Sequence, residues 1–120
     1  MSDVKDLVDR YIAIWNETKA ACRQELIART WAEAASYIDP LMQSQGHAGL
    51  DTMIAGVQQR FPDFRFSLLG RPDAHGEHLR FSWALGPQDG EAVVKGTDFA
   101  VIRDGRLQAV TGFLDQVPAH

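Results

Sequence analysis

Two side chains that lie far apart in the sequence carry the groups that a proton-transfer site needs. Asp39 stands in Tyr37-Ile38-Asp39-Pro40, at the end of an apolar stretch, and Tyr11 lies in a segment with helical spacing of apolar residues. A carboxylate can accept a proton from the carbon beside a carbonyl, and a tyrosine hydroxyl can donate a hydrogen bond to the oxygen that becomes negative. Asp39 and Tyr11 are therefore candidate catalytic residues.

Each of these residues also has a structural interpretation. An Asp-Pro pair is typical of a solvated turn, because Pro disfavours helix in the preceding residue and the Asp carboxylate bonds readily to nearby backbone amides. A tyrosine on an apolar helix face is commonly a core residue whose hydroxyl is bonded to a neighbour. The sequence leaves both alternatives open, and the choice depends on whether Asp39 faces a cavity.

A third candidate catalytic acid, Asp98, lies within an apolar strand-like run, in Gly96-Thr97-Asp98-Phe99. A buried carboxylate must be paired or neutralised, so an acid at this position calls for an explanation. Alternation along a strand places Thr97 and Asp98 on opposite faces, and a bulge or a slip of one residue reverses which of them faces a pocket.

The elements that must position these residues follow from the spacing of apolar side chains. Helical spacing predicts three helices, over about 4–15, 19–30 and 50–61, with a short strand at 36–38 between the second and the third. Gly46 and Gly49 precede the third helix, and Pro62 ends it.

After Pro62 the apolar period changes from helical spacing to alternation, which predicts strands. Four runs, at about 64–68, 79–85, 92–103 and 107–114, form an expected antiparallel meander. The turn signals between them are Gly70-Arg71-Pro72-Asp73, Gly86-Pro87-Gln88-Asp89-Gly90 and Asp104-Gly105. Helices first and strands afterwards predict an α+β fold with the helices on one face of the sheet, and 120 residues fit one domain over 1–120.

Charge and composition exclude several classes of function. The net charge of −4 comes from interspersed acids and bases, which disfavours a nucleic-acid partner, and no apolar run is long enough to predict a membrane span. The first residues lack the features of a signal peptide and the single Cys22 cannot form an internal disulfide, so we expect a cytoplasmic protein. Cys22 itself is expected to be a small buried side chain.

No cofactor or metal is expected. Gly-rich phosphate-binding loops are absent from the sequence, and the four histidines show no recognised metal-ligand spacing. These histidines are His47, His75, His78 and His120.

The aromatic content predicts a pocket for a small, largely apolar ligand with a carbonyl or enol group. The candidate ligand-binding aromatic residues are Trp15, Trp31, Phe66, Phe81, Trp83, Phe99 and Phe113. On the other face of the sheet, Val94, Ala100 and Ile102 form an apolar row that would need cover, which predicts a homodimer interface.

The order of these segments resembles the nuclear transport factor two-like superfamily, most closely its ketosteroid isomerase and SnoaL-type polyketide cyclase branch. The matching segments are Leu7-Val8-Asp9-Arg10-Tyr11, Tyr37-Ile38-Asp39-Pro40, Gly46, Gly96-Thr97-Asp98-Phe99 and Asp104-Gly105-Arg106-Leu107. The resemblance implies a cystatin-like fold in which a strongly curved, mainly antiparallel sheet and three N-terminal helices enclose a cone-shaped pocket, often in a homodimer. It also implies a cofactor-free isomerase or cyclase, with a noncatalytic ligand-binding or dimerisation module as the alternative.

Carried over position by position, the isomerase pattern gives Tyr11 as an oxyanion donor and Asp39 as the general base. The second oxyanion donor of that family, a protonated aspartate, aligns with Thr97, which is a weaker donor and is taken as a ligand-binding candidate. In a related epoxide hydrolase the acid on the final strand falls at Gly112, so epoxide hydrolysis is the less expected reaction.

Overall fold

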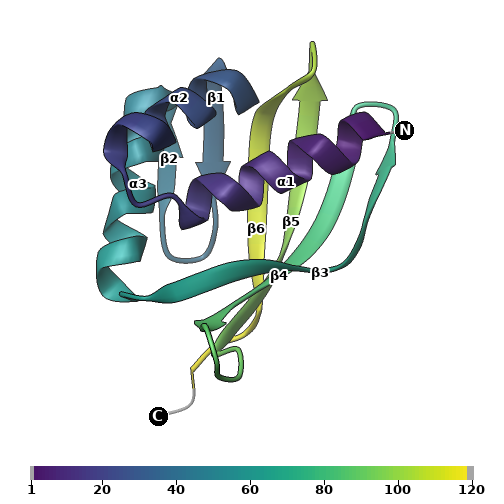
Figure 1. Ribbon diagram of the computed structural model, residues 1–120. Coiled ribbons are helices and arrows are strands. Elements are labelled where there is room, and N and C mark those ends of the chain that lie inside the picture. Colours follow the sequence, from purple (N-terminus) through teal and green to yellow (C-terminus); the bar gives the residue numbers. More distant parts are fainter. Residues whose placement is uncertain (1, 119–120) are drawn as a thin grey trace.

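Six strands form one mixed sheet in the order β2-β1-β6-β5-β4-β3, and three helices lie against it (Figure 1). The structure is a computed structural model that describes residues 2–118, with side chains described from residue 4 onward. The elements are α1 (Ser2–Asn16), α2 (Ala20–Thr30), β1 (Trp31–Ile38), β2 (Gln43–Gln45), α3 (Gly46–Arg60), β3 (Phe64–His75), β4 (His78–Pro87), β5 (Val94–Arg103) and β6 (Arg106–Gln116). The α+β prediction, its three helices and its four C-terminal strands are confirmed.

The pairing within the sheet is antiparallel except at one junction. Strands β3 to β6 pair in sequence order, as the predicted meander requires, and β1 then lies parallel to β6. The β1 strand is longer than the predicted 36–38 segment, and the short β2 strand that pairs with it was not predicted. The parallel junction brings the end of β1, and therefore Asp39, beside the middle of β6.

The sheet curves because its ladder is interrupted in several places. The pairing of β3 with β4 shifts between Leu69 and Asp73, and the β5–β6 and β1–β6 pairs contain further register shifts. Such bulges bend a strand and increase its twist. The predicted turn at 70–73 is therefore wrong: Gly70, with φ of +69°, lies in the irregular part of a continuous β3, and the hairpin turn follows at Gly76.

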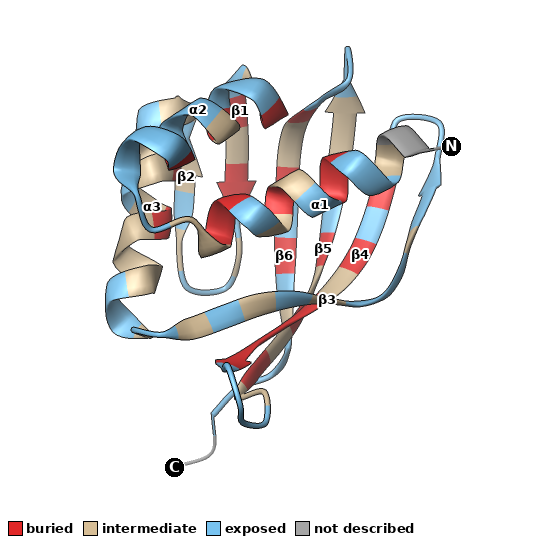
Figure 2. Cartoon of the chain, viewed as in Figure 1, coloured by how far each residue is buried: buried red, intermediate tan, exposed pale blue. Residues whose placement is uncertain are grey.

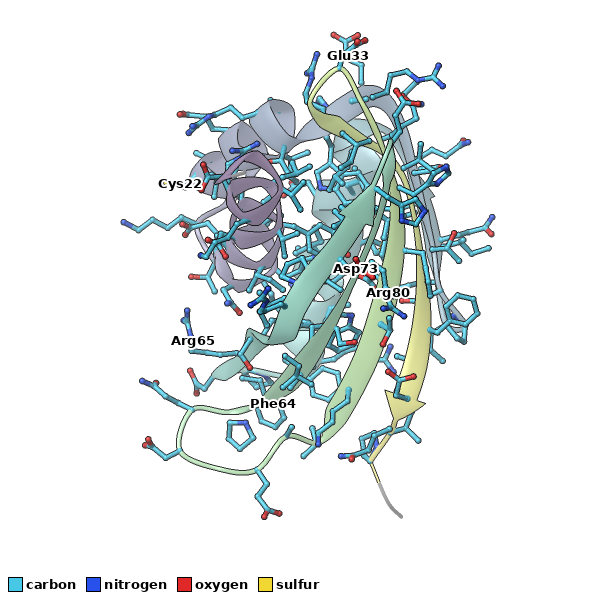
Figure 3. All side chains as sticks on the ribbon, turned by 90° about the vertical axis from the view of Figure 1, so that its right-hand side faces the viewer. Cys22, Glu33, Phe64, Arg65, Asp73 and Arg80 are labelled. Atoms are coloured by element: carbon cyan, nitrogen blue, oxygen red, sulfur yellow. The ribbon has the colours of Figure 1, made fainter. Side chains whose placement is uncertain are left out.

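The helices cover one face of the sheet, which is the concave one. Figure 1 shows α1 running across the strands, and the view in Figure 3 shows the helices gathered on one side of the sheet. The side of α1 that faces the strands is buried (Figure 2), and it contributes Val8, Tyr11 and Ile14 to the core. Ile27 from α2 and Ile54 from α3 close the same core.

The predicted outward row on β5 is wrong. Val94 and Ala100 are buried, and Ile102 packs against the core cluster, so all three contribute to the interior rather than to an exposed surface. Cys22 is also not buried as predicted, because it lies on the exposed side of α2 (Figure 3). Within residues 2–118, no helix is both long enough and apolar enough to cross a membrane.

Candidate functional site

A pocket of about 370 Å³ opens between α1, α3 and the concave face of the sheet. Its wall is mostly apolar, and its ionisable groups are two carboxylates, two tyrosine hydroxyls and one guanidinium. The lining residues are Tyr11, Ile12, Trp15, Tyr37, Asp39, Leu41, Met42, Val57, Arg60, Phe61, Phe66, Trp83, Leu85, Val94, Asp98, Leu114, Val117 and Pro118. A cavity of this size and composition suits a small apolar ligand oriented by a few polar groups.

Asp98 is the buried acid of this pocket, with only 1% of its surface exposed. The Tyr11 hydroxyl donates a hydrogen bond of 2.5 Å to its Oδ2, and the Trp83 indole nitrogen donates one of 3.0 Å to its Oδ1. Three elements therefore meet at one carboxylate: α1 through Tyr11, β4 through Trp83 and β5 through Asp98 itself. This clamp fixes the carboxylate while keeping it on the pocket wall.

Burial changes the proton affinity of this cluster. Burial raises the pKa of Asp98 to about 6, against the opposing hydrogen bonds from Tyr11 and Trp83, and the nearby Asp39 charge adds to the rise. Burial, together with the negative charge of Asp98, also holds the pKa of the Tyr11 hydroxyl well above its usual value. The same two causes raise the pKa of Tyr37. Both tyrosines are therefore neutral hydrogen-bond donors at physiological pH.

Asp39 lies on the pocket wall and also forms the turn that its Pro neighbour indicates. Its Oδ1 accepts hydrogen bonds from the backbone amides of Leu41 (2.8 Å) and Met42 (3.0 Å), and its Oδ2 accepts the Tyr37 hydroxyl (2.7 Å). The turn that the sequence indicated is confirmed, and it does not keep Asp39 from the pocket wall. Asp39 faces the cavity, but three donors already occupy its oxygens.

Gly112 on β6 separates the two acid–tyrosine pairs. A Cβ atom at this position would lie 2.9 Å from Asp98 Oδ1, 3.2 Å from Asp39 Cβ and 3.3 Å from the Tyr37 hydroxyl. Only a residue without a side chain leaves room for both pairs to approach.

The predicted aromatic residues divide into wall and core. Trp15, Phe66 and Trp83 line the pocket, and the Trp15 ring packs on Phe66 with centroids 5.3 Å apart. Trp31 and Phe81 do not reach the wall, but both pack against the Tyr11 ring, with centroids 5.8 and 5.0 Å away. They hold the tyrosine in place from behind rather than contacting a ligand.

Three of the predicted ligand-binding residues lie on the opposite, convex face of the sheet. Thr97 bonds to Ser82 and to Asp115 there, while Phe99 and Phe113 stack edge to face and are 46% and 52% exposed. The prediction for Thr97, Phe99 and Phe113 is therefore wrong.

The sheet register explains why Asp98 faces the pocket. Directly opposed residues on adjacent strands share a face, and Asp98 is opposed by Phe81 on β4 and by Gly112 on β6. Thr97 is opposed by Ser82 and Phe113, which places it on the outer face with them. The structure thus places Asp98, and not Thr97, on the pocket wall.

Sequence reasoning also missed two polar groups of the wall, Tyr37 and Arg60. Tyr37 is the first residue of the motif that singled out Asp39, and its spacing of two from Asp39 along the strand indicated a shared face. Arg60 stands in the last turn of α3, where a basic residue is expected on electrostatic grounds and draws no attention.

Comparison with known proteins gives a consistent picture. Residues 8–110 match the SnoaL-like domain family. A candidate isomerase of the SnoaL-like family from Agrobacterium tumefaciens strain C58 is 43% identical, with a TM-score of 0.91 over 96% of this chain and 99% of that one. No curated protein has a matching sequence.

Two more distant structures share the fold. A candidate ketosteroid isomerase from Kribbella flavida is 22% identical, with a TM-score of 0.72 over 99% of this chain and 82% of that one. A candidate polyketide cyclase from Sinorhizobium meliloti is 17% identical, with a TM-score of 0.70 over 89% of this chain and 93% of that one. At these identities the likeness concerns the arrangement of helices and strands.

Proposed function

The chain belongs to the SnoaL-like family, and from this premise we propose that it is a cofactor-free isomerase or cyclase that moves a proton next to a carbonyl group. The observation that carries the proposal is the Asp98 carboxylate on the wall of an apolar pocket, with its pKa raised to about 6. A base is most effective when its pKa lies near the working pH, because it is then ionised and still holds a proton well.

In this proposal Asp98 is the general base, a role that the family resemblance gives to Asp39. Asp98 takes the proton from the carbon beside the ligand carbonyl, the C–H electron pair forms the enolate, and the protonated acid returns the proton to another carbon. Asp39 acts mainly as a positioning group, because its oxygens accept three hydrogen bonds, two of them from the backbone of the turn at 39–42, whereas Asp98 accepts two, both from side chains. Its negative charge also contributes to the raised pKa of Asp98.

The Tyr11 hydroxyl is the proposed donor to the enolate oxygen. Tyr11 donates to Asp98 while the carboxylate is charged. Once Asp98 has accepted a proton its oxygens attract that donor less strongly, so the Tyr11 hydroxyl can turn to the oxygen that has become negative. Tyr37 lines the same wall, but its single O–H is donated to Asp39, so it positions that carboxylate rather than the ligand oxygen.

A homodimer is the assembly we propose, with the convex face of the sheet as the interface. Phe99, Phe113 and Ile38 expose 46%, 52% and 47% of their surfaces, and Phe113 and Phe99 form one aromatic pair. Exposed aromatic clusters of this kind mark interaction surfaces.

The test is isomerisation of a simple β,γ-unsaturated ketone by the wild type, Asp98→Asn and Asp39→Asn, followed by the absorbance of the conjugated product. We expect Asp98→Asn to lower kcat/KM by about 10²–10⁴-fold, because it removes the base, and Asp39→Asn to have a clearly smaller effect. The opposite order of the two variants would return the base to Asp39. Absence of turnover in the wild type, with retained ligand binding, would favour the noncatalytic ligand-binding module.

A further inference from the structure

Charge is distributed unevenly along the pocket wall. The negative groups, Asp98 and Asp39, belong to the cluster with the two tyrosines, and Arg60 in the last turn of α3 is the single basic side chain among the lining residues that the structure describes. An anionic ligand group placed at the tyrosine cluster would face two carboxylates. The same group beside Arg60 would face an opposite charge.

Arg60 is exposed and has no hydrogen-bond or ion-pair partner within residues 4–118. Some arginines of the chain are paired: the guanidinium of Arg23 bonds to Asp51, and that of Arg80 bonds to Asp73 at 3.2 Å. Among the residues that the structure describes, Arg60 is distinguished by being both unpaired and part of the pocket lining. A guanidinium offers several donors in a planar fork that matches a carboxylate. At Arg60 this fork is available to a ligand.

Two other residues of the pocket lining are apolar and exposed. Leu41 and Val117, which line the same pocket, expose 73% and 55% of their surfaces. Apolar side chains of this size at the edge of a cavity are covered when an apolar ligand occupies it. The mouth therefore combines apolar surface with one unpaired positive charge.

We propose that the pocket binds an apolar oxo acid, with its carboxylate on Arg60 at the mouth and its enolisable carbonyl at the Asp98 cluster. This substrate class rests on the proposed function, because the placement of the carbonyl follows from the role of Asp98. Electrostatics fixes the orientation of such a ligand: its anionic end is attracted by Arg60 and repelled by Asp98 and Asp39. A volume of about 370 Å³ limits the ligand to a small molecule.

The binding test uses 2-naphthylacetate and its uncharged amide, 2-naphthylacetamide, as probes of equal shape. Binding is followed by quenching of tryptophan fluorescence, since Trp15 and Trp83 line the pocket, and is checked by calorimetry. The variants are Arg60→Gln and the matched control Arg65→Gln. Arg65 is exposed on β3 (Figure 3) and does not line this pocket.

We expect the wild type to bind the acid more tightly than the amide, and Arg60→Gln to weaken acid binding about tenfold while changing amide binding less than twofold. Arg65→Gln should leave both affinities unchanged. Equal losses for acid and amide in Arg60→Gln would overturn the proposal, because Arg60 would then only pack on the ligand. Equal losses of acid affinity in Arg60→Gln and Arg65→Gln would also overturn the proposal. A wild type that binds the acid no more tightly than the amide would overturn it too.

Asp98→Asn separates this inference from the proposed function. The variant loses a negative charge inside the pocket, so acid binding should be retained or strengthened while turnover is lost. Binding of the acid that depends on Arg60, without turnover of any enolisable acid, would leave the inference standing and remove the proposed function. Turnover of neutral ketones, together with acid binding that does not depend on Arg60, would leave the proposed function standing and remove the inference.

Discussion

The two faces of the sheet at strands β5 and β6 differ sharply, although alternate residues of the same two strands form them. On the concave face, Asp98 and Gly112 are opposed, and the acid is buried and clamped by two donors. On the convex face, Thr97 and Phe113 are opposed one position away, and Phe113 is half exposed. A single step along the strand separates a chemical site from an apolar outer surface.

The space of a single Cβ atom contributes to the difference between the two faces. The concave face holds small or polar side chains where the acid–tyrosine pairs meet, because Gly112 leaves the room that a Cβ would occupy. The convex face has no such restriction and holds bulky Phe99 and Phe113. Changes on the concave face should therefore alter proton chemistry, and changes on the convex face should alter assembly.

The largest effect concerns the dependence of stability on pH. The folded protein holds the Asp98 proton more tightly than the unfolded chain, because the pKa of Asp98 rises from 3.8 to about 6. The contribution of Asp98 to the free energy of unfolding is therefore complete below about pH 3.8 and falls as the pH rises to about 6, by up to about 3 kcal/mol. Urea unfolding across this range should show Asp98→Asn gaining stability relative to the wild type as the pH rises.

The control for this measurement is Phe99→Leu on the convex face, which touches no carboxylate through a hydrogen bond and should follow the wild type at every pH apart from a constant offset. A difference between Asp98→Asn and the wild type that does not change between pH 4 and pH 7 would show that burial does not perturb this acid, and the two faces would then be electrostatically alike.

A methyl group at Gly112 should be the next most damaging change. Gly112→Ala places a carbon 2.9 Å from Asp98 Oδ1, so the acid or the strand must shift, with an expected loss of about 1–3 kcal/mol and of turnover. The matched variant is Gly56→Ala in α3, where the added carbon meets nothing within 4 Å and should stabilise the helix by about 0.5–1 kcal/mol. Thermal unfolding of both variants checks the pair; similar outcomes would contradict the crowding at Gly112.

Trp83→Phe should have a smaller effect that is specific to pH. The indole of Trp83 donates to Asp98 Oδ1, and this hydrogen bond stabilises the charged carboxylate and lowers its pKa. The change to Phe removes the donor, so the pKa of Asp98 should rise. We expect the acid limb of the kcat/KM profile to move to higher pH by about one pH unit. The control is Ser82→Ala. Ser82 precedes Trp83 on β4 and bonds to Thr97, not to Asp98, so this change should leave the acid limb of the profile in place. A shift in both variants would point to a general loosening of the strand.

The smallest effect on the pocket is expected from Phe113→Asp. The new charge on the convex face should convert the proposed homodimer into a monomer in equilibrium sedimentation, while the affinity for 2-naphthylacetate stays within about twofold. A wild type that sediments only as a monomer would remove the homodimer proposal. A large loss of affinity in the variant would mean that the two faces are coupled.

The sequence predicted the elements of this fold well and the facing of β5 poorly. The apolar period changes at Pro62 from helical spacing to alternation, and the structure changes from helices to strands there. In β5, by contrast, apolar side chains point both ways: Val94 and Ala100 inward, Phe99 and Val101 outward. Because neither face is purely polar, the hydrophobic pattern does not specify which residues face the core.

The candidate site was predicted in part. Tyr11 and Asp39 were found from their residue types and flanking motifs, and both line the pocket. Asp98 was found as an acid in an apolar strand, but its facing remained open. Arg60 carried no signal, since a basic residue near the end of a helix is common for reasons unrelated to a ligand.

The sequence by itself determined the order of helices and strands, the family, and the two acids available for chemistry, because periodicity, turn residues and motifs are local properties of the chain. Only the tertiary structure decided the division of labour between these acids. The register of β4, β5 and β6 buries Asp98 between Tyr11 and Trp83, and the parallel β1–β6 junction brings Asp39 beside it with its oxygens occupied. The pKa of a carboxylate depends on burial and on partners distant in sequence, which the local pattern does not contain.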